Sequence, residues 1–112
     1  MFSKELLKGT LSAIILKLLS DRDRMYGYEI YQNVKGMSDG KILLKDGSLY
    51  PALQKMIADG LLSFHEESVG GRIRKYYSLT KKGQREKVVY LKELREFMLT
   101  VNRIVFPETK GI

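Results

Sequence analysis

The sequence predicts a mainly helical α+β fold, with helices ahead of a β-hairpin and a long helix at the end of the chain. Three observations predict it. Apolar residues recur at helical spacing through most of the chain before Gly60. Two strand-like stretches, LLSFHEES and IRKYYSLT, flank the turn sequence VGGR. An uninterrupted helical pattern then runs from about Thr80 to Val105, before Pro107.

Composition narrows the class of partner. The chain has 112 residues, enough for one domain or one domain with an arm. Its formal net charge of +7 favours polyanions such as nucleic acid or an anionic membrane surface, although charge alone leaves a merely basic protein open. The absence of cysteine excludes disulfides and thiolate zinc sites. Because Glu5 and Lys17 interrupt the apolar N-terminus and no stretch is apolar enough to span a bilayer, we expect a cytoplasmic protein without membrane contact.

The first helix is predicted from about Lys4 to Ser20, followed by the polar loop SDRDR. The second lies in MYGYEIYQNVKG, begins near Gly27 and is expected to end at Gly36. The loop GMSDGK and a short strand, ILLK, come next. The apolar stripes of the two helices are Leu7, Leu11, Ile14, Ile15 and Leu18, and Ile30, Tyr31 and Val34.

The third helix is predicted in DGSLYPALQKMIADGLL, residues 46–62. Asp46 or Ser48 is expected to cap it, Pro51 to occupy its first turn and Gly60 to end it. Its inner stripe is Leu49, Leu53, Met56 and Ile57. Gly70 and Gly71 suit the positive φ of a tight hairpin tip between the two strands that follow.

The last helix carries a heptad seam, broadened by Tyr90, Phe97 and Ile104. This stripe either folds back on the first helix of its own chain or meets a second copy, and we expect a homodimer. Residues 1–80 are predicted to form the DNA-binding domain, 81–106 the dimerisation helix and 107–112 a tail. The expected dimer contacts are Leu7, Leu11, Leu91, Leu94, Met98, Val101 and Val105.

Helices ahead of a glycine-tipped hairpin make a winged helix-turn-helix, in which the helix before the hairpin enters the major groove N-terminus first. Ser48 and Tyr50 then suit phosphate or sugar, while Gln54 and Lys55 suit base edges. The alternatives are that Ser48 only caps and that Tyr50 only packs against Tyr26 or Tyr28. The residues expected to contact DNA are Tyr26, Lys41, Ser48, Tyr50, Pro51, Gln54, Lys55, Arg72, Arg74 and Lys75.

The segments MYGYEIYQNV, GSLYPALQKMIADGLL and GGRIRKYYSLTKKG, with the aliphatic first helix, resemble the PadR family of bacterial transcriptional regulators from about Leu6 to Gly83. The resemblance implies a winged-helix homodimer that represses genes from a pseudo-palindromic double-stranded DNA operator. It also implies release by a small molecule. The family's recognition helix matches Ser48 to Pro51, its supporting helix Tyr26 to Glu29 and its wing Arg72, Arg74 and Lys75. The single C-terminal helix matches the smaller subfamily.

One departure concerns the effector. The drug-responsive branch of the family places a tryptophan in the dimer helix, and the matching position here is Leu94. Stacking of flat drugs at that position is therefore not expected. For a small apolar or aromatic effector, the candidate site is an apolar cavity between the two chains, lined by Leu11, Ile15, Leu94, Phe97 and Met98. The alternative is that these residues are plain core.

Two other function classes fit the sequence less well. An enzyme is not expected, because the single histidine, His65, has no second histidine at helical spacing and strand geometry turns it away from Glu66. No cofactor or metal is expected either. A winged helix that binds protein instead of DNA is the second alternative, and a neutral or acidic wing would favour it.

Overall fold

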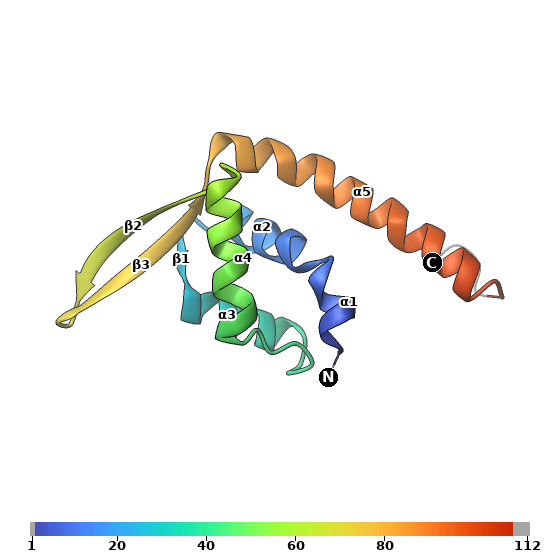
Figure 1. Ribbon diagram of the computed structural model, residues 1–112, viewed down its shortest axis with the longest axis horizontal. Helices are drawn as coiled ribbons and strands as arrows, with labels where there is room; N and C mark the ends of the chain where they lie inside the picture. Colours follow the sequence, from blue (N-terminus) through green and yellow to red (C-terminus); the bar gives the residue numbers. More distant parts are fainter. Residues whose placement is uncertain (1, 109–112) are drawn as a thin grey trace.

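The computed structural model describes residues 2–108 and confirms the predicted fold class (Figure 1). One antiparallel sheet has the strand order β1-β3-β2, with helices packed against one of its faces. The elements follow in the order α1 (Lys4–Lys8), α2 (Leu11–Ser20), β1 (Met25–Tyr26), α3 (Gly27–Met37), α4 (Asp46–Ala58), β2 (Leu62–Val69), β3 (Arg72–Leu79) and α5 (Lys81–Val105).

The prediction of one N-terminal helix is wrong, because the chain forms α1 and α2 with a break at Gly9 and Thr10. The Gly9 N–H bonds to the Leu7 carbonyl, and the Thr10 hydroxyl donates to the same oxygen at 3.1 Å. Glycine is a poor helix former, and a threonine that bonds the preceding turn competes with helix propagation. Only α2 is anchored in the core.

Two further predictions between residues 36 and 45 are wrong. Gly36 does not stop α3, which ends at Met37 and is followed by left-handed backbone at Asp39 (φ 52) and Gly40 (φ 78). The ILLK segment forms no strand, since β1 takes the free edge of β3. The apolar ILLK segment instead contributes to the core, where Leu44 is buried.

The start of α4 also differs from expectation. Lys45 is the N-cap and contributes no side-chain hydrogen bond, so neither Asp46 nor Ser48 caps the helix. Pro51 is inside α4, beyond its first turn, and its missing N–H removes the bond to the Gly47 carbonyl. Gly60, with φ 78, ends the helix as predicted.

The core lies where α2, α3 and α4 meet the inner face of the sheet. Leu49, Leu53 and Met56 contribute the inner stripe of α4, and Tyr77 is the large residue that β3 adds. The predicted hairpin is confirmed, with Gly70 and Gly71 at its tip at φ 55 and φ 80. Burial on the inner face leaves the outer face of α4 and the wing beyond the core exposed.

The long helix α5 starts at the body and then extends beyond it (Figure 1). Its first half packs on α2, and the Tyr90 hydroxyl donates to the Gly9 carbonyl at 2.9 Å. Beyond Leu94 most of its apolar side chains are exposed, including Met98 at 58% and Ile104 at 74%, whereas Leu99 is half-buried. Within the described range, no helix has the length and apolarity needed to cross a membrane.

Candidate nucleic-acid interface

The outer face of α4 offers polar side chains to a partner. Helical spacing turns Leu49, Leu53 and Met56 into the core and leaves the opposite stripe exposed. Lys55 has an exposed ion pair with Asp59 at 2.9 Å, which is easily exchanged for a phosphate. The exposed predicted contacts on α4 are Ser48, Tyr50, Pro51, Gln54 and Lys55.

Tyr50 is held against the first residue of α3. A Cβ built on buried Gly27 would lie 2.9 Å from Tyr50 Cζ and 3.1 Å from Cε1, and closer still to the hydroxyl oxygen. The pKa of the neighbouring Tyr77 phenol is raised above its ordinary value, mainly by burial and secondly by the electrostatic effect of Tyr50. Tyr50 is nevertheless 40% exposed. Packing and surface exposure, which the sequence offers as alternatives, therefore coexist in this side chain.

A hollow of about 670 Å³ opens between the starts of α3 and α4. Tyr28, Tyr31 and Tyr50 line it together with Lys45 and the acidic Asp46. The rings of Tyr28 and Tyr31 stack at a centroid distance of 6.0 Å. Phenols and a lysine ammonium are donors suited to a sugar–phosphate backbone, so this hollow belongs to the candidate interface.

The outer face of the sheet carries a cluster that sequence reasoning missed. Arg24 forms an ion pair with Glu67, and its guanidinium lies 4.0 Å from the centroid of the Tyr76 ring. The His65 ring stacks on the Tyr76 ring at a centroid distance of 5.7 Å, and His65 Nε2 lies 3.2 Å from Glu67 Oε2. We call Arg24, His65, Glu67 and Tyr76 the outer-sheet cluster.

The outer-sheet cluster ties the loop before β1 to β2 and so steadies the wing. Hydrogen bonds from Arg24 and then His65 hold the pKa of the Glu67 carboxyl below its ordinary value of 4.5. The sequence gives little indication of this cluster. Arg24 lies in the charged segment SDRDR, which reads as a loop, and β1 has only two residues, too few for a recognisable strand pattern. Strand alternation alone places His65 and Glu67 on one face, but not Arg24 beside them.

Two of the predicted wing cations lie over aromatic rings. The Arg74 guanidinium is 4.1 Å from the Tyr26 ring centroid, and Lys75 Nζ is 4.1 Å from that of Phe64. Tyr26 is half-buried and also meets Tyr76 edge-on at 5.6 Å. Tyr26 therefore supports Arg74 from below rather than standing free on the surface.

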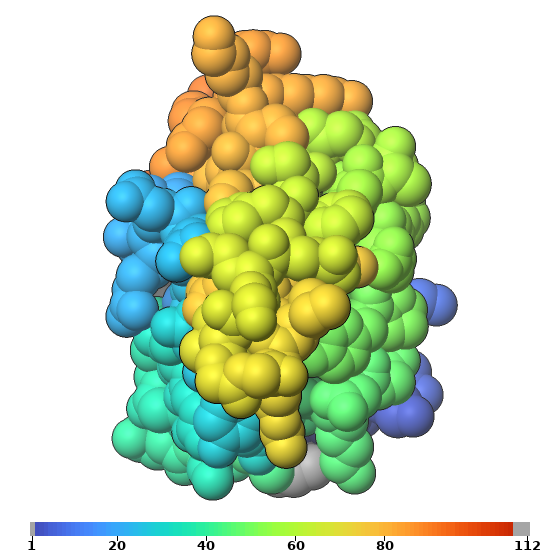
Figure 2. All heavy atoms as spheres, turned by 90° about the vertical axis from the view of Figure 1, so that its left-hand side faces the viewer, coloured from blue at the N-terminus to red at the C-terminus, as the bar shows by residue number. Residues whose placement is uncertain are grey.

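Charges balance across the hairpin. The strand register sets Glu66 opposite Lys75 and Glu67 opposite Arg74. Arg72 lies opposite Val69 at the exposed tip. Glu66 and Glu67 thus offset part of the positive charge of the wing, and among Arg72, Arg74 and Lys75 the exposed residue is Arg72. Figure 2 looks onto this wing, with α4 beside it.

The remaining predicted residues fall in three places. Lys41 is exposed in the connection between α3 and α4. Of the expected dimer contacts, Leu91 and Leu94 are half-buried beside α2, whereas Met98, Val101 and Val105 are exposed; on the N-terminal side, Leu7 and Leu11 are half-buried. Of the expected pocket residues, Ile15 lies in the core, Phe97 is 63% exposed, and Leu94 and Met98 line a groove beside α2.

Within residues 2–108 there is no group of three or more histidine or carboxylate side chains placed to hold a metal ion. The fold and the exposed face of α4 define a winged-helix protein of the DNA-binding class.

Comparison with known proteins identifies the family. The profile of the "Transcriptional regulator PadR-like family" matches residues 15–88. The chain belongs to this family of transcriptional regulators, which are not enzymes.

Two individual proteins are similar to the chain in sequence. An uncharacterized protein of Lysinibacillus sphaericus is 32% identical over 94% of this chain and 93% of its own length. The transcriptional regulator YqjI of Escherichia coli K12 is 32% identical over 79% of this chain, which covers 39% of YqjI.

Among solved structures, a transcriptional regulator from Clostridium thermocellum superposes with a TM-score of 0.84 at 25% identity, over 91% of this chain and 99% of that one. A PadR-like transcription factor from Bacteroides fragilis gives 0.72 at 34% identity, over 90% and 95%.

Proposed function

We propose that the protein is a homodimeric, sequence-specific DNA-binding repressor whose DNA affinity is lowered by a small-molecule effector. The observation that carries the DNA-binding part is the polar outer face of α4, exposed above an apolar inner face that is fully packed. In this proposal the exposed Ser48 and Tyr50 contact the sugar–phosphate backbone at the helix start, and the exposed Gln54 and Lys55 contact base edges one turn on.

Two copies are needed to read a pseudo-palindromic operator. The exposed apolar residues of α5 support dimerisation, because a patch of this kind on an isolated chain marks an interaction site. They include Phe97, Met98, Val101, Ile104 and Val105. In such a dimer the recognition helices would address half-sites about 34–36 Å apart, one turn of the duplex.

The test is a titration of labelled DNA from upstream of the protein's own gene, followed by fluorescence anisotropy, with a scrambled fragment in parallel. We expect the native fragment to bind more tightly and its affinity to fall steeply between about 50 and 200 mM salt. Equal binding of both fragments would reject sequence-specific recognition of this DNA.

Variants locate the contact. Tyr50→Ala and Arg72→Ala are each expected to weaken native-fragment binding roughly tenfold, or about 1.4 kcal/mol, in variants that thermal unfolding shows to be still folded. Arg72→Ala should also reduce the slope of log affinity against log salt by about one unit. Lys92→Ala removes one exposed charge from α5 and is the matched control. Wild-type affinity in both interface variants would remove this face from the proposal.

A second function, binding of a protein partner through the wing, draws on one observation. Glu66 and Glu67 face Lys75 and Arg74 across the hairpin, which lowers the charge that the wing offers to phosphates. Absence of binding to either DNA fragment, with an intact dimer, would favour this alternative.

A further inference from the structure

We propose that Ile73 is a specificity-determining residue of the wing, an aliphatic side chain that enters the minor groove of bound DNA and disfavours G·C base pairs there. The inference deepens the DNA-binding part of the proposed function and rests on it. It adds an apolar residue to the expected wing contacts, which are the cations Arg72, Arg74 and Lys75.

Ile73 has almost no cover from its own chain. It is the second residue of β3, next to the hairpin tip, and it is 74% exposed. Its partner across the ladder is Ser68, a short and exposed side chain that cannot shield it. In Figure 1 this end of the hairpin projects away from the helices. A partner that covers Ile73 therefore gains the free energy of apolar burial.

Strand geometry places Ile73 on the side of the sheet where α4 lies. Side chains two residues apart share a face of a strand, so Ile73, Lys75 and Tyr77 point the same way. Tyr77 is buried in the core that the sheet forms with α2, α3 and α4. A partner that contacts the proposed recognition helix and the wing together, the view in Figure 2, therefore also meets Ile73.

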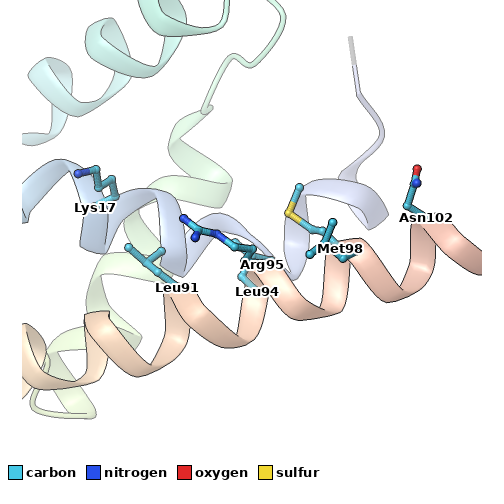
Figure 3. Close-up of a pocket in the computed structure, with 7 residues that line it drawn as sticks. Lys17, Leu91, Leu94, Arg95, Met98 and Asn102 are labelled. Carbon is cyan, nitrogen blue, oxygen red and sulfur yellow. The ribbon is translucent and has the colours of Figure 1, made fainter. Parts of the chain in front are cut away.

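The exposed apolar residues in the second half of α5 have a different explanation. They continue the row that Leu91, Leu94 and Met98 form beside α2 (Figure 3), and the proposed dimer covers them. Ile73 lies at the opposite end of the molecule from this part of α5 (Figure 1). The dimer contact therefore does not account for its exposure.

The charges around Ile73 favour DNA as the partner. Arg72 precedes it at the exposed tip, and Lys75 follows it on the same face. Glu66 lies opposite Lys75 and offsets its charge, so Arg72 is the cation left for phosphates. One aliphatic side chain beside a guanidinium, on a narrow two-stranded ribbon, suits a groove with sugar walls and phosphate rims. Because α4 is assigned to the major groove, the groove available to the wing is the minor one.

The chemistry of the minor groove converts this apolar contact into a sequence preference. A·T pairs present only acceptors on the groove floor, whereas G·C pairs add the 2-amino group of guanine, which is a donor. Ile73 has no acceptor, so it buries this amino group without a hydrogen-bond partner, which is unfavourable. Ile73 therefore favours positions in the operator that lack guanine.

The test uses two duplexes that differ in this amino group. Alternating inosine–cytosine and guanine–cytosine duplexes present the same groups in the major groove, but inosine lacks the 2-amino group in the minor groove. We expect the full-length protein to bind the inosine duplex at least about fivefold more tightly, in anisotropy titrations at about 50 mM salt.

Ile73→Val and Ile73→Thr form a matched pair of variants. Both replacements are β-branched and nearly equal in shape, but only threonine has a hydroxyl that can accept from the amino group. Ile73→Val should keep the preference, and Ile73→Thr should reduce it to about twofold or less. Val89→Thr is the control, because it adds a hydroxyl at an exposed site on α5 and should leave the preference unchanged. Thermal unfolding verifies the fold of each variant.

Equal affinity of the wild type for the two duplexes overturns the proposal and leaves the DNA-binding function standing. A preference that changes equally, or not at all, in Ile73→Val and Ile73→Thr also overturns it, and assigns Ile73 to the β-structure of the hairpin or to a protein partner. Failure of the wild type to bind either duplex removes this inference and the proposed DNA binding together. A protein that shows the predicted preference but binds native and scrambled fragments equally keeps this contact and loses sequence-specific repression.

Discussion

A single methyl group added at Gly27 is expected to displace Tyr50 from the position in which we propose that it contacts DNA. The added Cβ would stand 2.9 Å from Tyr50 Cζ, whereas ordinary contact begins at 3.4 Å, and the hydroxyl oxygen would be closer still. Tyr50 is 40% exposed and has room to turn outward, so the ring yields rather than the backbone. The Gly27→Ala variant should therefore fold.

The expected magnitudes follow from this geometry. Overpacking costs about 1–3 kcal/mol, and we expect the lower end because an exposed ring can move. Replacement of glycine by alanine in a helix returns up to about 1 kcal/mol. The free energy of unfolding should then fall by about 1 kcal/mol or less. DNA affinity should fall roughly tenfold, the same loss as in Tyr50→Ala, because the same contact is lost.

The assay is a double-mutant cycle on DNA affinity, measured by anisotropy, with the variants Gly27→Ala, Tyr50→Ala and the combination. In the Tyr50→Ala background, Gly27→Ala should change affinity by about twofold or less. Gly36→Ala is the control. Gly36 lies in the same helix as Gly27, and a Cβ built on it would meet nothing within 4 Å. Full wild-type affinity in Gly27→Ala, or an undiminished loss in the Tyr50→Ala background, would refute the reasoning.

Three further predictions concern stability and assembly. Gly83→Ala should lower the free energy of unfolding by about 3 kcal/mol or more in chemical denaturation, because its Cβ would press on the backbone carbonyl of Leu61; an unchanged midpoint would contradict this. Glu67→Gln should lower the melting temperature near neutral pH, and the difference from wild type should vanish as pH falls below 4.5. The reason is that a carboxyl with a lowered folded-state pKa stabilises above its ordinary value and loses this effect on protonation; a pH-independent difference would count against it. Met98→Glu should yield a monomer by light scattering with helical content retained, and a wild-type dimer mass would exclude Met98 from the interface.

Local patterns predicted most of the secondary structure, because they depend on neighbours in the chain. The period of apolar residues located α2, α3, α4 and α5, and the two glycines located the hairpin tip. Errors arose where two local signals competed. Gly36 is a helix breaker by propensity, yet the helix continues through it and ends only where Asp39 and Gly40 adopt left-handed backbone.

The candidate interface likewise contains residues that the sequence places and contacts that depend on tertiary packing. The exposed stripe of α4 follows from helical spacing, so Gln54 and Lys55 could be placed from the sequence. The contact between Gly27 and Tyr50 could not, because it joins the starts of two helices and depends on how they pack. The same holds for Arg24, which reaches Glu67 only when β1 pairs with β3.

The sequence by itself determined the class of fold, the hairpin with the long helix after it, and the family, since periodicity, turn glycines and motifs are properties of the chain. Only the tertiary structure decided which part of the apolar seam on α5 is buried within the chain. Its first half, with Leu91 and Leu94, is half-buried beside α2, and its second half, with Met98 and Val105, remains exposed. A heptad pattern states that a face is apolar but not what covers it, because burial depends on the distance between helices that only packing sets.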